Sequence, residues 1–163
     1  MTKSDDAWKA LSQINDLIKV ADAKAGVVLA SAGVLGGIVV RAVPSPTQWR
    51  ESWFHTGLLL LSIALVSVSI LLSLRAFVPR LRTGGSRSLL HFDNIARRYT
   101  TAADFSTACR ALFEQHERLQ DAVITQLWAT SKIARRKFRS VTCAIISLGF
   151  ALLTALAAGV LGN

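Results

Sequence analysis

The sequence predicts an all-α membrane protein in which three transmembrane helices are continuous with a cytosolic helical bundle. The chain has 163 residues, of which 52% are hydrophobic, and its mean hydropathy of +0.41 is high for a soluble domain. The apolar residues gather in three long runs, at 25–43, 56–78 and 141–161. Each run has about the 20 residues that a helix needs to cross a bilayer core. Much of the remaining chain shows amphipathic helical spacing.

Residues 1–24 are predicted to be a cytosolic N-terminal helix, starting near residue 5. Trp8, Leu11, Ile14 and Ile18 recur at spacings of three and four, which places them on one helical face. Packing against another cytosolic helix accounts for this stripe. The acidic residues and the long amphipathic lead do not match a signal peptide.

Residues 25–43 form the first predicted transmembrane helix. Gly26, Ala30, Gly33 and Gly37 fall on one face, and Gly33 with Gly37 makes a GxxxG pair. Small residues at this spacing let helix backbones approach closely in lipid. The pattern fits either packing against the protein's own helices or an interface between subunits, and the sequence leaves both open.

Two prolines end that helix, and residues 44–55 are predicted to be a short periplasmic loop before the second span at 56–78. Ser62, Ser69 and Ser73 share one face of this span. We expect their hydroxyls to bond to a carbonyl one turn earlier in the same helix. The alternative is that they line a narrow wet path in an oligomer.

Residues 79–140 are predicted to be a second cytosolic helical region, followed by the third span at 141–161. A TGGS turn at 83–86 precedes its first helix. No Pro or Gly occurs from 120 to 148, so we expect one continuous helix to leave water and enter lipid. Within the region the apolar spacing predicts three helices, at 88–99, 104–116 and 117–140.

The distribution of basic residues predicts the topology. Seventeen of the 19 Lys and Arg residues lie in 1–24 and 75–140, whereas 41–55 has only Arg41 and Arg50. Basic residues stay on the cytoplasmic side. We therefore expect a multi-pass protein of the bacterial inner membrane, with its N-terminus in the cytoplasm and its C-terminus in the periplasm.

Three stretches carry a resemblance to a known family: ADAKA at 21–25, HFDNIARRY at 91–99 and QLWATSKIARRKF at 126–138. In order, spacing and position against the spans, the chain resembles the membrane effectors of the Pycsar antiphage system, PycTM. The resemblance implies an effector that senses a cyclic pyrimidine nucleotide, cUMP or cCMP, made by a neighbouring cyclase. It implies that the effector then disrupts the inner membrane and aborts the infection. We expect it to be a homo-oligomer in contact with lipid, without DNA or RNA.

Recognition of a cyclic nucleotide needs a cation for the phosphate and favours a ring for the base. We rank Arg97 and Arg98 highest, because Lys137 and Arg139 are explained by orientation and anionic headgroups. The candidate nucleotide-binding residues are Arg97, Arg98, Tyr99, Lys132, Arg135 and Arg136.

Asp22 and Lys24 lie close to the membrane entry, where ionisable groups are costly unless they are paired or wet. We expect Asp22 to pair with Lys132, Arg135 or Arg136. Such a pair would be a latch, since a phosphate would compete with Asp22 for the cation.

The helix that contains the third span could also couple ligand binding in the cytosolic region to movement within the membrane. A ligand that tilts its cytosolic portion would move residues 141–161 with it. Ala151, Ala155 and Gly159, at four-residue spacing, give that span a close-packing face.

We expect no enzyme, no metal and no cofactor, because His55, His91 and His116 are scattered and no catalytic or metal-binding spacing accompanies them. Two other functions stay open. One is a holin-like pore former that needs no ligand. The other is a membrane scaffold that binds anionic lipid or a cytosolic partner.

Overall fold

The computed structural model describes residues 3–44, 53–78 and 92–161, and within these ranges every regular element is an α-helix. This confirms the predicted all-α fold class. The predictions for loop residues 45–52, for the turn at 83–86, for the helix start at Ser88 and for His91 lie outside the described residues.

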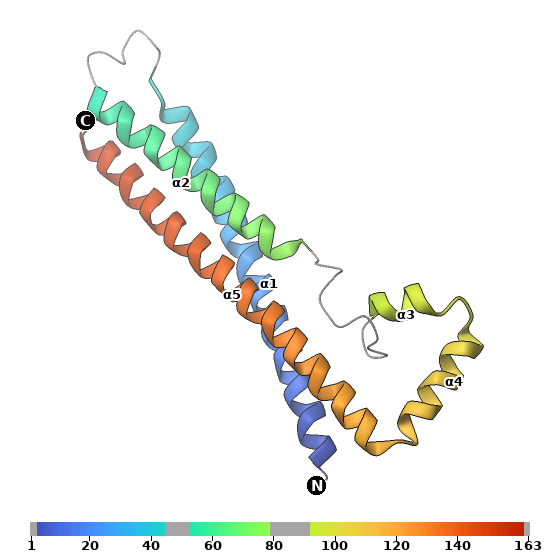
Figure 1. The fold of residues 1–163 in the computed structure, drawn as a ribbon. Coiled ribbons are helices and arrows are strands. Elements are labelled where there is room, and N and C mark those ends of the chain that lie inside the picture. Colours follow the sequence, from blue (N-terminus) through green and yellow to red (C-terminus); the bar gives the residue numbers. More distant parts are fainter. Residues whose placement is uncertain (1–2, 45–52, 79–91, 162–163) are drawn as a thin grey trace. The chain divides into compact units, whose positions relative to one another are not determined.

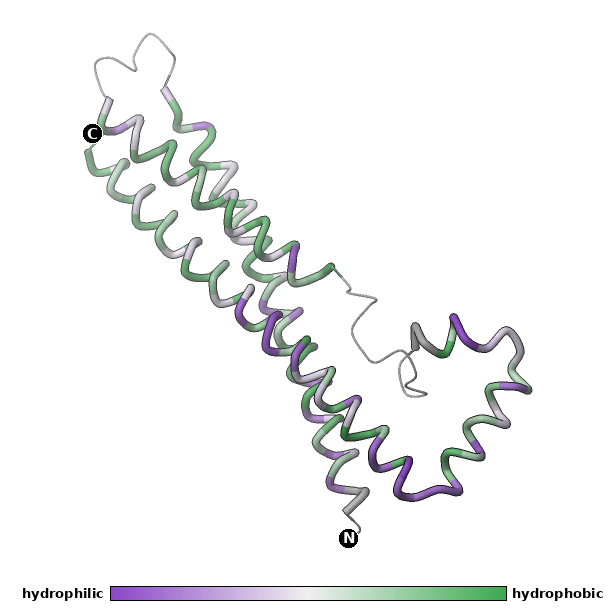
Figure 2. Tube along the Cα trace, viewed as in Figure 1, coloured by the Kyte–Doolittle hydropathy of each residue, from purple (hydrophilic) through white to green (hydrophobic). Residues whose placement is uncertain are grey.

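Three helices are long and apolar enough to cross a membrane: α1 (Lys3–Ala42), α2 (Trp53–Phe77) and α5 (His116–Leu161). Figure 2 shows α2 and the C-terminal part of α5 as predominantly hydrophobic. The helix expected over 120–161 is indeed continuous, and it begins at His116. The second helix begins at Trp53 rather than at residue 56, since nothing from Trp53 to the span breaks a helix.

The chain divides into two compact units. The first unit comprises Met1–Lys19 and Pro79–Arg135, and the second comprises Val20–Val78 and Arg136–Asn163. Because α1 and α5 run past these boundaries, each helix contributes residues to both units.

The first unit contains the beginnings of α1 and α5 together with α3 (Phe92–Arg98) and α4 (Ala102–Phe113) (Figure 1). Its buried apolar residues include Leu11, Val123 and Ala129. The break predicted at 101–104 is an N-cap, in which the Thr101 hydroxyl accepts from the Asp104 amide at 3.2 Å and so fixes the start of α4.

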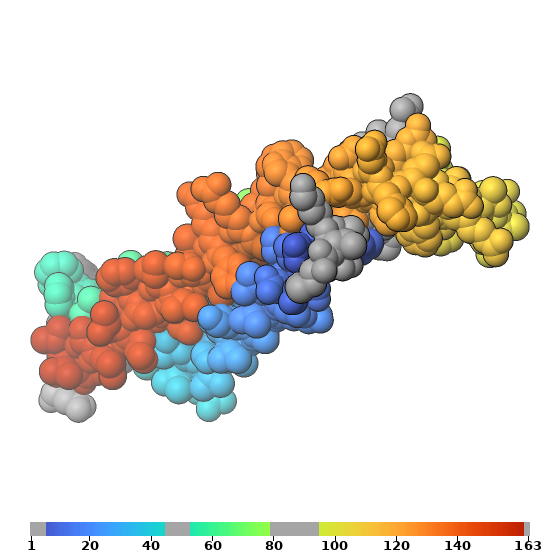
Figure 3. All heavy atoms as spheres, turned by 90° about the horizontal axis from the view of Figure 1, so that it is seen from below, coloured from blue at the N-terminus to red at the C-terminus, as the bar shows by residue number. Residues whose placement is uncertain are grey.

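The second unit is a bundle of three helices, in which α1 and α5 run in the same direction and α2 runs in the opposite one (Figure 1). The space-filling view in Figure 3 also places α1 beside α5. Three apolar clusters each take one buried residue from each helix. They are Ala25, Ala76 and Val141; Ala32, Val66 and Ala151; and Val39, Leu59 and Ala158.

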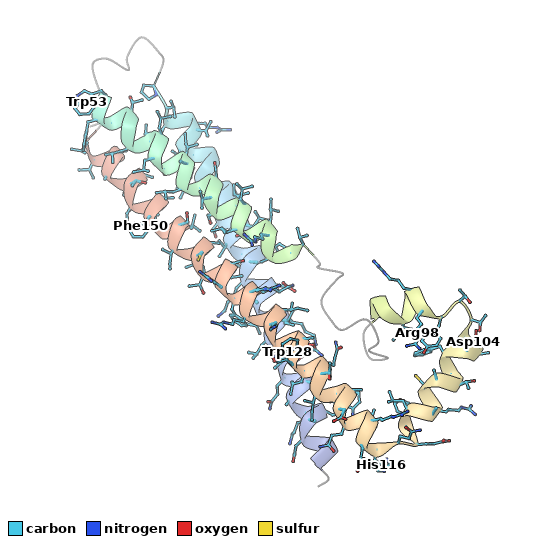
Figure 4. The ribbon with its side chains drawn as sticks, viewed as in Figure 1. Trp53, Arg98, Asp104, His116, Trp128 and Phe150 are labelled. Carbon is cyan, nitrogen blue, oxygen red and sulfur yellow. The ribbon has the colours of Figure 1, made fainter. Side chains whose placement is uncertain are left out.

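The buried positions recur at alternating spacings of three and four. On α1 they include Ala21, Ala25, Val28 and Ala32, and on α5 the positions at 137, 141, 144 and 148 face inward at the same spacing. This heptad spacing is that of helices packed at a small crossing angle. Large apolar side chains at the other positions, such as Phe150, point outward, as expected of a face in contact with lipid (Figure 4).

Hydroxyl groups join α2 to α5 inside this bundle. Ser62 Oγ donates to the carbonyl oxygen of Ala151 at 2.8 Å, and Ser69 Oγ donates to that of Ala144 at 2.9 Å. Ser147 Oγ of α5 donates in the other direction, to the Leu65 carbonyl at 2.9 Å. The prediction that Ser62 and Ser69 bond within their own helix is therefore wrong.

The reason is the face on which these serines lie. Ser62, Ser69 and Ser73 are fully buried at the contact with α5, where small side chains bring a second backbone within reach. Ser67, which is exposed on another face of α2, does bond to the carbonyl one turn earlier, that of Ile63, at 2.9 Å. Ser73 is buried, and its hydroxyl finds no hydrogen-bond partner among the described residues.

Candidate functional site

The cations that we ranked highest lie where α3 meets α4 in the first unit. Arg97 and Arg98 form the last turn of α3 and are exposed. The Arg98 guanidinium lies 5.6 Å from the centre of the Tyr99 ring, which is a cation–π contact. Tyr99 in turn meets Phe105 of α4 edge to face, with ring centres 5.6 Å apart. The half-buried Tyr99 ring therefore packs α3 against α4.

The second group of candidate cations lies on α5. Lys132 and Arg135 belong to the first unit, Arg136 begins the second, and all three side chains are exposed. The Lys132 ammonium lies 3.6 Å from the centre of the Trp128 ring, one turn earlier on the same helix. One cation of each group therefore lies over an aromatic ring, Arg98 over Tyr99 and Lys132 over Trp128.

Trp128 is a residue that reasoning from the sequence missed. The residue is 60% exposed, and the Lys132 ammonium lies over one face of its ring. The signal was present in the stretch QLWATSKIARRKF, where a tryptophan precedes a lysine by four residues and so shares its helical face.

Asp22 pairs with Lys137 in the second unit. The Lys137 ammonium donates to Asp22 Oδ1 at 2.5 Å, and the Lys137 and Asp22 side chains are 18% and 35% exposed, respectively. The expected partners Lys132, Arg135 and Arg136 are thus wrong. Lys137 lies three residues after buried Ala134 and four before buried Val141, so its side chain faces inward, whereas the other three face outward. Lys24 is also exposed and lies apart from this pair on the surface of α1.

The small residues of α1 lie on two different faces. A Cβ placed on Gly33 or Gly37 would meet nothing within 4 Å, and Ala30 is exposed, so this GxxxG face is open in the single chain. Gly26 lies near Phe77, because a Cβ placed on it would be 3.7 Å from the ring. The internal contacts of α1 instead use Ala25, Ala32 and their neighbours on the opposite face.

The expected small-residue face of the third span is also divided. Ala151 is fully buried against Ala32 and Val66, and Ala155 packs against the cluster that contains Val39. A Cβ placed on Gly159 would meet nothing within 4 Å. Ala151 and Ala155 thus hold this bundle together, and Gly159 lies outside it.

Among residues 3–44, 53–78 and 92–161, no three His, Cys, Asp or Glu side chains gather closely enough to hold a metal ion. The first unit thus has two exposed cations beside aromatic rings, Arg98 and Lys132. The second unit has the half-buried ion pair between Asp22 and Lys137 within a bundle of three apolar helices. Together these features define an all-α membrane protein whose first unit exposes basic residues next to aromatic side chains.

Comparison with known proteins identifies the family. Residues 6–162 match PycTM, described as the Pycsar effector protein domain, so the chain belongs to this family. The Pycsar effector protein PtPycTM of Propioniciclava tarda is 28% identical over 167 residues, which cover 98% of this chain and 81% of the relative. The Pycsar effector protein MePycTM of Micromonospora echinofusca is 48% identical over 48 residues, covering 29% of this chain and 81% of that relative. No solved structure matches. Membership of the family assigns the protein the role of an antiphage effector.

Proposed function

We propose that this protein senses a cyclic pyrimidine nucleotide, cUMP or cCMP, through its first unit, and that binding makes the second unit disrupt the inner membrane. The loss of membrane integrity then aborts the infection. The family supports the effector role, and a nucleotide made by a cyclase is the signal that the Pycsar name implies. The excess of basic residues in 1–24 and 75–140 supports a cytoplasmic first unit and a periplasmic C-terminus.

The observation that carries this proposal is the continuity of α5. The helix begins at His116, bears Lys132 and Arg135, and reaches Leu161 without a break, and it has no charged residue from Val141 onward. A helix is stiff because each turn is hydrogen-bonded to the next. A displacement of its charged portion by a ligand is therefore passed to its apolar portion. The ligand drives this change only if it binds the active form better than the resting form.

The ion pair between Asp22 and Lys137 acts as a latch on the resting form in this proposal. It joins α1 to α5 at the end of the second unit where the apolar cluster of Ala25, Ala76 and Val141 begins. Both charges lie beside apolar surface, where an unpaired charge is costly. Rearrangement of α1 against α5 breaks the pair, so the pair favours the arrangement described above.

In this proposal, the membrane is disrupted when several copies of the protein assemble. Gly33 and Gly37 leave an open strip on α1 between flanking apolar side chains, and α1 carries no charge from Ala25 to Val40. A second copy of α1 would pack closely on this strip. We propose that copies meet there in the active form and that ions leak at or around the assembly.

Calorimetry of the purified protein with cUMP, cCMP, cAMP and cGMP, followed by dye release from liposomes, tests the proposal. We expect binding of cUMP or cCMP and release only when that nucleotide is present. Release without any nucleotide would instead make the protein a ligand-independent pore former. Absence of release under every condition would favour a scaffold for anionic lipid or a partner protein.

A further inference from the structure

We infer that Trp128, Lys132 and Arg135 form the nucleotide-binding surface, which we call the platform. The base stacks on the Trp128 ring, and Lys132 and Arg135 bind the phosphate. This inference rests on the proposed nucleotide-sensing function and assigns it to one face of α5. Neither the family match nor the relatives assign a role to these three residues.

The first argument is the exposure of Trp128. The inward positions of this part of α5 include Val123, Thr130 and Ala134, and Trp128 lies on another face with 60% of its side chain exposed. Ile124, one turn earlier, is 48% exposed. An exposed apolar patch on a charged helix is a surface suited to a ligand.

An aromatic belt at the membrane surface does not account for this tryptophan. Trp128 precedes Val141, the first residue of the uncharged run, by thirteen residues, which is about 20 Å along a helix. The polar layer on each side of a bilayer core is only about 5–8 Å thick. By this measure the ring lies beyond the headgroups, in contrast to Trp53 at the start of α2 (Figure 4).

The second argument is the placement of charge beside the ring. The Lys132 ammonium lies 3.6 Å from the ring centre, and Arg135 follows at i+7 from Trp128 on the same face, also exposed. Four and seven residues correspond to about 6 and 10 Å along the helix. The Lys132 side chain is long and flexible, and Arg135 adds a second long cationic side chain, so both can reach the phosphate of a mononucleotide whose base lies on the ring. A rotation of the Lys132 side chain uncovers the ring for the base and brings the ammonium to the phosphate.

Tyr99 is a weaker candidate for the stacking ring. It is half-buried, one edge meets Phe105, and Arg98 lies over its face. Its contacts hold α3 against α4, so a base would have to disrupt them. The Trp128 ring requires only that one flexible lysine move.

Titration of the full-length protein in detergent with cUMP and cCMP tests the platform. In a Trp8→Phe, Trp49→Phe, Trp53→Phe background, binding at Trp128 is expected to quench the remaining tryptophan fluorescence. By calorimetry, Trp128→Leu is expected to weaken binding about 10-fold or more, while Trp128→Phe retains most of it. Lys132→Gln is expected to weaken binding several-fold and to reduce its dependence on salt, and Lys132→Arg to retain both.

Matched controls separate the platform from general damage. Trp8→Leu removes another partly exposed tryptophan of the first unit, and Arg118→Gln removes an exposed cation elsewhere on α5. Both are expected to bind like the unmodified protein. Unchanged affinity in Trp128→Leu, with the unmodified protein binding normally, would overturn the platform and leave the proposed function standing. If the unmodified protein binds none of the four nucleotides, the proposed function itself fails, and the platform with it.

Discussion

Lys137 of α5 donates a hydrogen bond to Asp22 of α1, and this ion pair joins two residues that are 115 positions apart in sequence. Both residues belong to the second unit, and both side chains are more than half buried. The pair is a specific polar contact between α1 and α5 in a bundle that also relies on small apolar side chains and on hydroxyl groups between α2 and α5.

Breaking this pair should release the resting form. We expect Asp22→Asn to raise nucleotide-independent dye release from liposomes several-fold, because the pair contributes about 0.5–1 kcal/mol after allowance for its partial exposure. The double exchange Asp22→Lys with Lys137→Asp should restore the low background. Asp16→Asn, which removes the exposed partner of Lys19, is the control. Unchanged release and unchanged toxicity in Asp22→Asn would remove the latch from the proposal.

The hydroxyl bonds between α2 and α5 should stabilise the second unit. We expect Ser62→Ala and Ser69→Ala each to lower the free energy of unfolding by about 0.6 kcal/mol, and by at most about 1.7 kcal/mol, as is typical of polar contacts between membrane helices. Thermal unfolding in detergent, followed by circular dichroism, measures the change. Ser67→Ala is the matched control, since its hydroxyl bonds within α2. If Ser67→Ala lowered the free energy of unfolding by the same amount, the hydrogen bonds between α2 and α5 would not stabilise the bundle more than a bond within one helix does.

The open strip on α1 should matter for assembly and not for the fold of one chain. We expect Gly33→Leu and Gly37→Leu to leave helix content and unfolding temperature unchanged, because a Cβ at either position would meet nothing within 4 Å. Cross-linking between copies and nucleotide-dependent leakage should both fall sharply. Gly149→Leu, at an equally open position on α5, controls for added bulk in the membrane. Intact cross-linking in both α1 variants would exclude this strip as the interface.

A flexible break in α5 should separate binding from leakage. We expect insertion of Gly-Gly after Ser140 to preserve nucleotide affinity by calorimetry and to abolish nucleotide-dependent dye release, because glycine disrupts the stiff helix. Insertion of Ala-Ala at the same point adds the same length but keeps the helix intact. This control shows how much of the loss of dye release comes from the added length and the changed orientation of residues 141–161 alone. Leakage that persists unchanged after Gly-Gly insertion contradicts transmission along α5.

The proposed topology makes a prediction for Cys109 of α4, which is partly exposed. In a Cys143→Ser background, a membrane-impermeant maleimide should label Cys109 only after the inner membrane has been opened. A cysteine introduced at Gly159 should be labelled in intact spheroplasts. The opposite result for Cys109 would place the first unit on the periplasmic side, where a cytoplasmic nucleotide cannot reach it.

The all-α membrane fold, the three apolar helices and the continuity of α5 could all be predicted before any coordinates were known. These properties follow from local quantities: run length, hydropathy and the absence of prolines and glycines between 120 and 148. The family also could be recognised from three short stretches, and the match over residues 6–162 confirms it.

Which helical faces meet, by contrast, became clear only from the packed bundle. Hydropathy does not determine which face of a helix turns toward its neighbours. Successive residues point about 100° apart around a helix, so Lys137 can face inward while Arg136 faces outward. The orientation of each helix in the bundle directs Ser62 and Ser69 to the carbonyls of α5, and it leaves Gly33 and Gly37 open. The contacts between helices depend on the register of neighbouring helices, which is set by how small side chains interlock and is not a property of any one segment.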